Sequence, residues 1–515
     1  MQVLPEKLYS VDSVVRLEQI AIQQYSIPAY TLMKRAGKAV FDVIQKNYSQ
    51  HENILVLCGA GNNAGDGYVV ATLAKQAGYP VRIVSLIDPV RLKNEALQAY
   101  SDWQQLETGN DADLTDAYKT DADKADLSLI DKADLIVDAL LGTGLRREVS
   151  SEWAEWINTV NQANKPVIAV DIPSGLVADT GVVAGSAIKA DITVCFIGLK
   201  QGMFTAQAKD VCGDIVFDDL GLTDDIYSQV EADADLLTSV DYSLLPERKQ
   251  ASNKGSFGHV LIVGGNKSMP GAIILAARSA LRTGAGLVTI VTVAENLTAI
   301  CSAVPEAMIK TCSSEDIAGV LPDAFVAGIT HIAIGMGLGQ DEWSLALLQY
   351  CVRLNKPMLI DADGLNLIAN EDITITSPLV ITPHPGEAAR LLSTATTVVS
   401  SGDIQQDRFD AIRKLYQLFS ESESCVVVLK GSGSLIFDGD DMNVCSLGNA
   451  AMAAPGMGDV LSGIIIALMA QGIKPGDAAE LGVCLHASAA SSFTENKTRG
   501  LLASDVIDEL TEVLQ

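Results

Sequence analysis

The chain has 515 residues, of which 48% are hydrophobic, and 36 Lys and Arg against 64 Asp and Glu give it a formal net charge of −28. This length predicts more than one domain, and the acidic charge argues against nucleic acid or an anionic membrane as a partner. Nine scattered Cys without C-x-x-C pairs, and a start without a signal-like apolar run, predict a cytoplasmic protein with reduced thiols.

Residues 10–50 are expected to form two helices, because apolar positions recur there at helical spacing. Five short apolar runs follow, each ending in Gly or a polar residue, and each is typical of a buried parallel strand: 53–59, 81–87, 134–142, 165–175 and 191–198. Helical segments separate most of them, which predicts a Rossmann-like, doubly wound α/β domain over residues 1–225. The Asp-rich stretch 107–134 is interpreted as a solvated surface segment.

Polar residues stand at the carboxyl ends of these strands, where ligands bind in such sheets. Asn63, Asp138 and Ser174 offer hard oxygen ligands that suit an alkali or alkaline-earth cation. Asp171, close to them in the pattern, is a candidate acid–base residue.

The Gly-rich turn after the first strand has a second interpretation. Gly59, Gly61 and Gly65 could form an ordinary dinucleotide loop, with Asp88 as the acid that binds a ribose. A pyrophosphate loop uses bare backbone, so the two Asn and the Asp within this turn favour a specific polar site instead.

Three motifs of this half, GAGNNAGDGY, DALLGTGL and VDIPSGL, resemble those of the NAD(P)H-hydrate epimerase domain. The family loop is usually Asn-Asn-Gly-Gly-Asp. This chain has Ala64 at the third place, where a small side chain is expected to preserve the loop shape. The resemblance implies a potassium ion at Asn63, Asp138 and Ser174, and substrate contacts at Asn62, Asn63, Ala64, Gly65, Asp66, Gly142, Thr143, Gly144, Leu145, Arg146, Arg147, Glu148 and Asp171.

The pattern fades between Gly221 and Lys249, where the chain is polar, acidic and poorly periodic. We therefore predict a linker over residues 226–240 and a second domain over residues 241–515. Strand and helix patterns alternate through this second part as well, which predicts another α/β domain.

The stretch 450–463, AAMAAPGMGDVLSG, is a Gly-rich turn that opens directly onto an apolar helix. Such a turn presents unpaired N–H groups at the positive end of a helix dipole, so it predicts an anion site, most often for phosphate. Asp459 would repel the anion unless it takes a proton from a hydroxyl that faces the phosphoryl group. The alternative is that Asp459 only caps the helix.

Two further residues, Lys430 and His384, each have a functional and a structural interpretation. Lys430 ends an apolar strand and precedes Gly-Ser-Gly-Ser, which suits a nucleotide phosphate better than an ordinary strand-end lysine. His384 stands between two prolines, where it could contact a ligand or simply bond to nearby backbone. Glu387 is interpreted as a carboxylate at a helix N-terminus.

This half resembles the ribokinase-like superfamily and, more specifically, the nucleotide-dependent NAD(P)H-hydrate dehydratases. The motifs are KGSFGHVLIVGG, MPGA, GMGLG, DADGLN, TPHPGEAARL, LKGSGS and AAPGMGDVLSG, in this order, with Met336 where Pro is common. The resemblance implies ADP as cosubstrate, with Mg²⁺, substrate contacts at Ala272, Gly337, His384 and Asp459, and contacts to the AMP moiety at Lys430, Gly431, Ser432, Gly433, Ser434 and Gly458.

Together the two resemblances imply a bifunctional NAD(P)H-hydrate repair enzyme. Its first domain would epimerise the R and S forms of hydrated NADH and NADPH (NADHX and NADPHX), with Asp171 in proton transfer. Its second would dehydrate the S form at the expense of ADP, with Asp459 as the base, and release AMP and phosphate. The alternatives are a small-alcohol kinase for the second half and a nucleotide-sensing or protein-binding module for the first. A homo-oligomer is expected.

Overall fold

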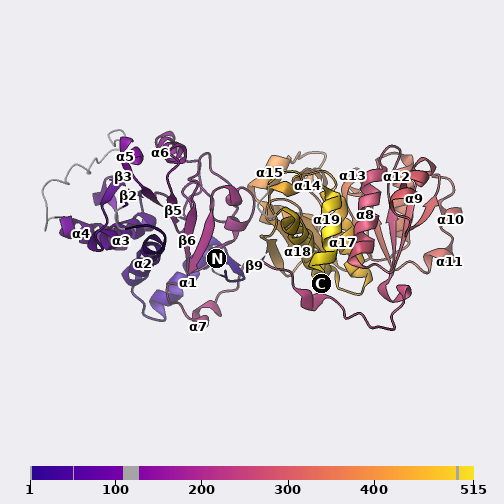
Figure 1. Cartoon of the computed structure of the whole chain (residues 1–515), viewed down its shortest axis with the longest axis horizontal. Coiled ribbons are helices and arrows are strands. Elements are labelled where there is room, and N and C mark those ends of the chain that lie inside the picture. Colours follow the sequence, from indigo (N-terminus) through magenta and orange to yellow (C-terminus); the bar gives the residue numbers. More distant parts are fainter. Residues whose placement is uncertain (1–2, 50–51, 108–126, 495–497, 515) are drawn as a thin grey trace. The chain divides into compact units, whose positions relative to one another are not determined.

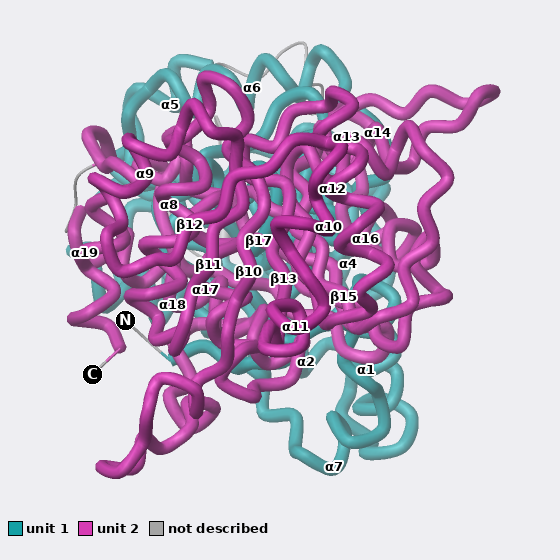
Figure 2. The backbone as a smooth tube through the Cα atoms, turned by 90° about the vertical axis from the view of Figure 1, so that its right-hand side faces the viewer, with its two compact units in different colours: residues 1–235 teal, residues 236–515 magenta. Residues whose placement is uncertain are grey.

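The computed structural model describes residues 3–49, 52–107, 127–494 and 498–514, so most of the Asp-rich stretch lies outside the described residues. The chain divides into two compact units, residues 1–235 and 236–515 (Figures 1 and 2). The division lies within the segment 226–240, which nevertheless holds regular structure: the end of α7 (Asp224–Tyr227) and β9 (Ala234–Leu237). Among the described residues, none of the helices has the length and apolar character that spanning a bilayer requires.

Unit 1 contains a six-stranded, entirely parallel sheet in the order β3-β2-β4-β5-β6-β8. The order reverses direction between β2 and β4, which is the place where doubly wound sheets bind ligands. The strands are β2 (Ile54–Cys58), β3 (Val81–Ser85), β4 (Leu135–Ala139), β5 (Val167–Val170), β6 (Ile192–Phe196) and β8 (Asp214–Asp218). The short strand β1 (Lys7–Tyr9) pairs with β7 (Leu199–Lys200) and β9.

Alternating residues of these strands face two separate cores, as expected for a sheet covered on both faces. In β2, Ile54, Val56 and Cys58 join one core, while Leu55 and Leu57 join the other. The helices of the first core are α1 (Val11–Gln23), α2 (Ala29–Asn47), α3 (Asn62–Gln76) and α4 (Asn94–Glu107), and those of the second are α5 (Ser128–Lys132) and α6 (Ser151–Gln162).

Unit 2 is built around strands in the order β12-β11-β10-β13-β14-β15-β16-β17-β18. The pairs from β12 to β16 are parallel, and β17 and β18 are added antiparallel. The strands are β10 (His259–Val263), β11 (Leu287–Thr292), β12 (Met308–Thr311), β13 (His331–Ile334), β14 (Met358–Ile360), β15 (Leu379–Ile381), β16 (Cys425–Leu429), β17 (Ser434–Phe437) and β18 (Met442–Cys445).

The helices of unit 2 lie between the strands from β10 to β16 and after β18. They are α8 (Pro270–Thr283), α9 (Leu297–Ala303), α10 (Ile317–Val320), α11 (Asp323–Val326), α12 (Glu342–Arg353), α13 (Ala362–Asn370), α14 (Pro385–Leu392), α15 (Ser401–Gln406), α16 (Arg408–Gln417), α17 (Met457–Ala470), α18 (Pro475–Thr494) and α19 (Ala503–Val513).

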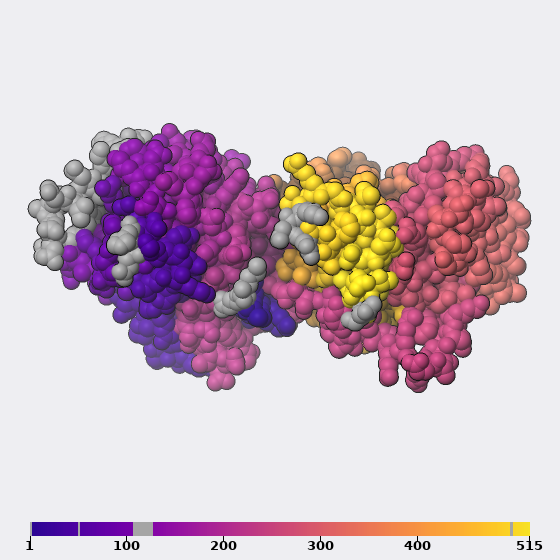
Figure 3. Space-filling model, viewed as in Figure 1, coloured from indigo at the N-terminus to yellow at the C-terminus, as the bar shows by residue number. Residues whose placement is uncertain are grey.

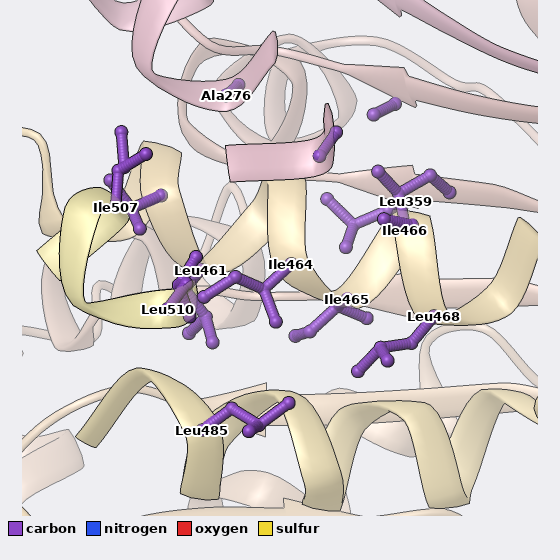
Figure 4. Close-up of a cluster of buried hydrophobic side chains, with 14 of the residues drawn as sticks. Ala276, Leu359, Leu461, Ile464, Ile465, Ile466, Leu468, Leu485, Ile507 and Leu510 are labelled. Carbon is purple, nitrogen blue, oxygen red and sulfur yellow. The ribbon is translucent and has the colours of Figure 1, made fainter. Parts of the chain in front are cut away.

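Helix α17 is the centre of the unit 2 core. Twelve of its fourteen residues are buried, because it is apolar on every side and packs against α8, α18 and α19 (Figure 4). Helix α19 buries Val506, Ile507 and Leu510 on its inner face, while its other face reaches the surface (yellow in Figure 3). The packing fixes α17 along its length, so the residues of its first turn have a rigid support.

Candidate active sites

A cavity of about 520 Å³ opens in unit 1 where the sheet order reverses between β2 and β4. It is large enough for much of a nucleotide-sized ligand. Of the predicted contact residues, the structure places the following in its lining: Asn62, Asn63, Asp66, Gly142, Thr143, Gly144, Leu145, Arg146, Arg147 and Asp171. Ala64 and Gly65 are buried behind the lining, and Glu148 is exposed outside it.

The residues Asn62–Asp66 form the first turn of α3 rather than a loop. Gly61 takes the strained position before the helix, with φ of +125°. Ala64 therefore lies in helical backbone, where alanine is the most favourable residue, and its departure from the family pattern costs no backbone strain. The prediction that the turn keeps its shape is consistent with this geometry.

Asp171 and Lys200 form a buried ion pair in the cavity wall. The Lys200 ammonium donates to Asp171 Oδ1, and also to the carbonyl oxygen of Phe196 at 3.0 Å. Lys200 is only 1% exposed, whereas Asp171 keeps 18% of its side chain accessible to the cavity. Burial lowers the pKa of Lys200, but Asp171 and Cys195, through their charges and hydrogen bonds, together outweigh burial and raise the pKa overall, so the lysine stays charged.

Asp171 has a left-handed backbone, with φ of +66°, directly after β5. Its main-chain N–H bonds to Val194 and its carboxylate accepts from the N–H of Phe196 at 3.1 Å. Asp tolerates this conformation better than most residues, and such backbone is often found at functional sites. The strain aims the carboxylate into the cavity.

Besides Asp171 and Glu95, two carboxyl groups line this cavity, Glu18 of α1 and Asp66 of α3. Burial, followed by repulsion from Asp171, raises the pKa of both groups above the ordinary values. The cavity therefore holds a lysine-paired carboxylate together with two carboxyl groups whose pKa is raised. Raised pKa values of this kind are common at sites that carry out acid–base chemistry.

The predicted cation ligands lie next to the cavity. Asp138 is fully buried and accepts hydrogen bonds from Ser174 Oγ (2.6 Å) and Ser174 N (2.8 Å). Burial raises the pKa of Asp138 to about 6 in spite of these bonds. Asn63 is 9% exposed, and within the described part of the chain neither its Oδ1 nor its Nδ2 has a hydrogen-bond partner. Asn63 packs against Gly142, because a Cβ added to Gly142 would lie 3.3 Å from the Cβ of Asn63.

A buried carboxylate and an unpartnered amide are costly without a ligand. A cation would compensate both, so the donor set fits a monovalent or divalent hard cation. No cluster of three or more His, Cys, Asp and Glu side chains suited to a metal is present in the described ranges.

In unit 2 the Lys430 ammonium lies among three carboxylates at the end of β16. It donates to Asp361 Oδ1 at 2.6 Å and lies 3.9 Å from Glu387 Oε2. Ser462 Oγ of α17 donates to the other oxygen of Asp361 at 2.8 Å. Asp361 is 2% exposed, and although burial alone would raise its pKa, Lys430 lowers it below the ordinary value.

Asp459 is the third residue of α17, which starts after Gly456 in a left-handed conformation. Burial and then repulsion by Asp361 raise the pKa of Asp459 to about 7, against the opposing charge of Lys430. Gly456 occupies the N-cap position of α17, so Asp459, which lies inside the first helical turn, is not the N-cap residue. The geometry therefore favours a base over a helix cap.

Lys430 directly follows β16, as the sequence predicted, and residues Lys430–Gly433 connect β16 to the antiparallel strand β17. Gly458 lies next to this connection, since a Cβ there would be 3.1 Å from Lys430 Nζ. Ser434 closes the turn by donating to the carbonyl oxygen of Gly431 at 3.2 Å. The predicted nucleotide residues therefore lie together with Asp459: Lys430, Gly431, Ser432, Gly433, Ser434 and Gly458.

The buried Arg408 of α16 supports this connection from behind. Its guanidinium donates to the carbonyl oxygens of Leu429 (3.0 Å), Lys430 (3.4 Å) and Gly433 (3.4 Å). Gly431 is close to it as well, because a Cβ there would lie 2.7 Å from Arg408 Nη1.

His384 caps α14: its Nδ1 accepts from the N–H of Gly386 at 2.9 Å, and its Nε2 lies 3.2 Å from Glu387 Oε1. His384 thus bonds to nearby backbone, as the turn interpretation predicts, while half of its side chain stays exposed and accessible to a ligand. Ala272 and Gly337 are neighbours, because a Cβ on Gly337 would lie 3.2 Å from Ala272 Cβ.

Lys200, Glu18, Ser462 and Arg408 were not identified from the sequence. Lys200 carries the signal that singled out Lys430, a lysine at the end of an apolar run. The other three are ordinary helix positions without a local signal, and only the fold brings them to the sites.

Comparison with known proteins gives two matching family models, described as YjeF-related protein N-terminus (residues 29–202) and NAD(P)H-hydrate dehydratase (residues 260–512). The chain is 40% identical to the bifunctional NAD(P)H-hydrate repair enzyme Nnr of Vibrio cholerae, over 99% of each chain. It is 40% identical to the enzyme of the same name from Escherichia coli, over 99% of this chain and 94% of the relative. A solved structure of ADP/ATP-dependent NAD(P)H-hydrate dehydratase from Bacillus subtilis is 29% identical, with a TM-score of 0.46, and covers 53% of this chain and 94% of that one.

Proposed function

The chain belongs to the family of bifunctional NAD(P)H-hydrate repair enzymes, and from this premise we propose which of its residues perform each reaction. Unit 1 is the epimerase, which interconverts the R and S forms of hydrated NADH and NADPH. Unit 2 is the ADP-dependent dehydratase, which returns the S form to NADH or NADPH. The family membership argues against a small-alcohol kinase in unit 2 and a purely binding role for unit 1.

Asp459 is the proposed base of the dehydratase. The hydrated substrate carries its hydroxyl at C6 of the nicotinamide ring, where it is a poor leaving group. Asp459 takes the hydroxyl proton while the oxygen attacks the terminal phosphorus of ADP, and the bond from that phosphorus to AMP breaks. Phosphate then leaves C6 and a proton leaves C5, which restores the dihydronicotinamide. The observation that supports this role is the half-buried Asp459, with its pKa of about 7, next to Lys430 and the Gly456–Gly458 turn.

The remaining groups of unit 2 hold the nucleotide. The Lys430 ammonium and the 430–434 connection are proposed to bind the AMP moiety and its phosphates. The N–H groups at Gly456–Gly458 lie at the start of α17, where helix N–H groups have no internal acceptor. They are placed to stabilise the charge that develops during transfer. Ala272, Gly337 and the exposed edge of His384 are the proposed substrate contacts.

Asp171 is the proposed proton-transfer residue of the epimerase. In the substrate, C6 is bonded both to a hydroxyl and to the ring nitrogen, so the nitrogen lone pair can expel the oxygen as water once it is protonated. Water then adds to the planar carbon from the other face and gives up a proton. Both proton transfers need a carboxyl group in reach of C6. The Asp171–Lys200 pair in the wall of the 520 Å³ cavity supports this assignment.

Asn63, Asp138 and Ser174 are proposed to hold a potassium ion. The fit rests on the unpartnered, buried Asn63 amide and on the buried Asp138 carboxylate. A bound cation would supply positive charge beside the cavity and fix the residues that follow β4. Magnesium bound with ADP, a homo-oligomeric state and a cytoplasmic location remain predictions.

The test is a repair assay with a mixture of both epimers of hydrated NADPH and with ADP, followed by the return of dihydronicotinamide absorbance. The intact enzyme is expected to convert the whole mixture. Asp171→Asn is expected to convert the S fraction at the normal rate and to leave the R fraction. Complete conversion of both epimers by Asp171→Asn would remove this residue from the epimerase, and no ADP-dependent recovery by the intact enzyme would contradict the assignment of unit 2.

A further inference from the structure

The ammonium of Lys430 has several carboxylates within reach but is fixed on one of them. Its hydrogen bond to Asp361 Oδ1 is 2.6 Å long, whereas the nearest oxygen of Glu387 lies 3.9 Å away. Asp361 is itself fixed, because its other oxygen accepts from Ser462 Oγ at 2.8 Å and its Oδ1 also accepts from the N–H of Ala362 at 2.8 Å. The acceptor of the lysine is therefore a rigid, buried group at the start of α13.

We propose that Asp361 is a positioning residue of the dehydratase. It holds the Lys430 ammonium beside the 430–434 connection, which binds the nucleotide, and away from the Asp459 carboxylate. The inference rests on the proposed role of Asp459 as the base. If Lys430 paired with Asp459 instead, the positive charge would make that carboxylate a weaker base and would no longer face the phosphates. The buried Asp361 carboxylate thus positions Lys430 and keeps Asp459 basic without touching the substrate.

Four charged groups that act on Asp459 fit this arrangement. Asp361 and Asp363 face it from the start of α13, Glu387 from α14, and Lys430 from the end of β16. Asp361 contributes the larger repulsion, and Lys430 partly offsets it. The result is a base that is half ionised close to neutral pH, where general-base catalysis is most effective.

The first test is the pH profile of dehydratase kcat in Asp361→Asn at saturating ADP. Asparagine keeps the size of the side chain and can still accept from Ser462, but it carries no charge. Lys430 is then free to approach Asp459, so the acid limb of the profile is expected to move to lower pH by about one unit. Ser462→Ala is the matched control, since it removes a hydrogen bond from Asp361 without changing any charge, and its acid limb is expected to stay in place.

Lys430→Met gives the opposite prediction. Without the ammonium, Asp361 and Glu387 repel the Asp459 carboxylate unscreened, and the acid limb moves to higher pH. A purely structural role for Asp361 would lower kcat at every pH and leave the limb where it is. Opposite movements in the two variants support the proposal; an unmoved limb, or a limb of Asp361→Asn that moves upward, overturns it.

If Asp361→Asn fails to fold because Lys430 loses its partner, the double variant Asp361→Asn, Lys430→Met removes the buried pair as a whole. The step from Lys430→Met to the double variant measures the direct repulsion by Asp361 alone, so it must be smaller than the step from the unaltered enzyme to Asp361→Asn, and equal steps overturn the proposal. Where Asp361→Asn does not fold, Asp361→Glu keeps the charge but moves the acceptor of Lys430, and an unmoved acid limb in that variant overturns the proposal. Failure of the proposed function is distinct from these outcomes, because the intact enzyme would then show no ADP-dependent recovery of NADPH at any pH.

Discussion

Arg408 Nη2 donates a 3.0 Å hydrogen bond to the carbonyl oxygen of Leu429, from a side chain that is completely buried. The same guanidinium reaches the carbonyl oxygens of Lys430 and Gly433, so the end of β16 and two points of the 430–434 connection are attached to α16. Lysine offers a compact ammonium that cannot bridge these acceptors. We expect Arg408→Lys to raise KM for ADP about tenfold, which corresponds to the loss of one charge-assisted hydrogen bond.

Arg413→Lys is the control for this prediction. Arg413 lies on the same helix, but its Nη1 donates to the carbonyl oxygen of Phe409 within α16 and not to the 430–434 connection. Both KM values of the dehydratase are expected to stay normal in this variant. If Arg408→Lys raised KM for the hydrated dinucleotide as much as KM for ADP, general damage to unit 2 would explain the result better than a displaced connection.

Lys200→Met is expected to impair the epimerase through Asp171. Methionine fills the same buried space but leaves the Asp171 carboxylate without its positive partner. The Asp171 carboxylate then lacks the ammonium that fixes its orientation, so the rate of R-to-S conversion should fall by about 10²-fold. The measurement is the rate of R-to-S conversion between pH 5 and pH 9.

The dehydratase reports whether the Lys200 variant is otherwise intact, since its rate on the pure S form depends on unit 2 alone. Lys189→Met, which removes an exposed lysine of unit 1, should leave both activities unchanged. An epimerase profile of Lys200→Met that superimposes on the normal one would show that the ion pair has no part in proton transfer.

The strand ends were predictable from the sequence because they are local features. A short apolar run that ends in Gly or Asp predicts a buried parallel strand, and the fold places Asp138, Asp171 and Lys430 at such ends. The first turn of α3 was harder to predict, because Asn62 and Asn63 are poor helix formers. It is helical because α3 packs over the sheet and Gly61 supplies the required backbone bend.

The partners of these residues could not be predicted in the same way. Lys200 meets Asp171 because β6 pairs with β5, and Ser462 meets Asp361 because α17 packs near β14. Strand order and helix packing decide both contacts, and neither leaves a trace within a few residues of sequence. The sequence predicted that Lys430 lies at a strand end, but it did not predict the hydrogen bond from Lys430 to Asp361.

Potassium is expected to stabilise unit 1 more at pH 8 than at pH 5. Burial raises the pKa of Asp138 to about 6, so the folded protein binds a proton there more readily than the unfolded chain. This site therefore lowers stability as the pH rises through the interval from about 4 to about 6, unless a cation compensates the carboxylate. Because the proton competes with the cation, the potassium concentration that gives half of the stabilisation should be about tenfold higher at pH 5 than at pH 8.

The measurement is the melting temperature of the protein against potassium chloride at the two pH values, with choline chloride at equal ionic strength as the control. Asp138→Asn removes the charge and should abolish the difference between the two salts. An equal effect of both salts on the unaltered protein would count against a cation at Asn63, Asp138 and Ser174.

Asp459→Asn should nearly abolish the dehydratase while ADP binding persists. The change keeps the size of the side chain and removes the proposed base, and general-base catalysis typically supplies about 10²–10⁴-fold in rate. The loss should fall mainly on kcat. Removing a carboxylate close to the phosphates relieves like-charge repulsion, so the Kd for ADP should stay the same or fall.

The alternative that Asp459 only caps α17 makes a different prediction for the same variant. Asparagine caps helices as well as aspartate, so the variant would then be almost silent. Asp410→Asn, which neutralises an exposed carboxylate paired with Lys414, controls for the loss of one negative charge. The deciding measurement is ADP-dependent recovery of NADPH from its S-hydrate, with R-to-S conversion as the internal control. Since Gly456 and not Asp459 occupies the N-cap position of α17, we expect the recovery to be lost and the epimerase rate to remain. Normal recovery would remove Asp459 from the mechanism, and with it the reason for Asp361 to hold Lys430 away from it.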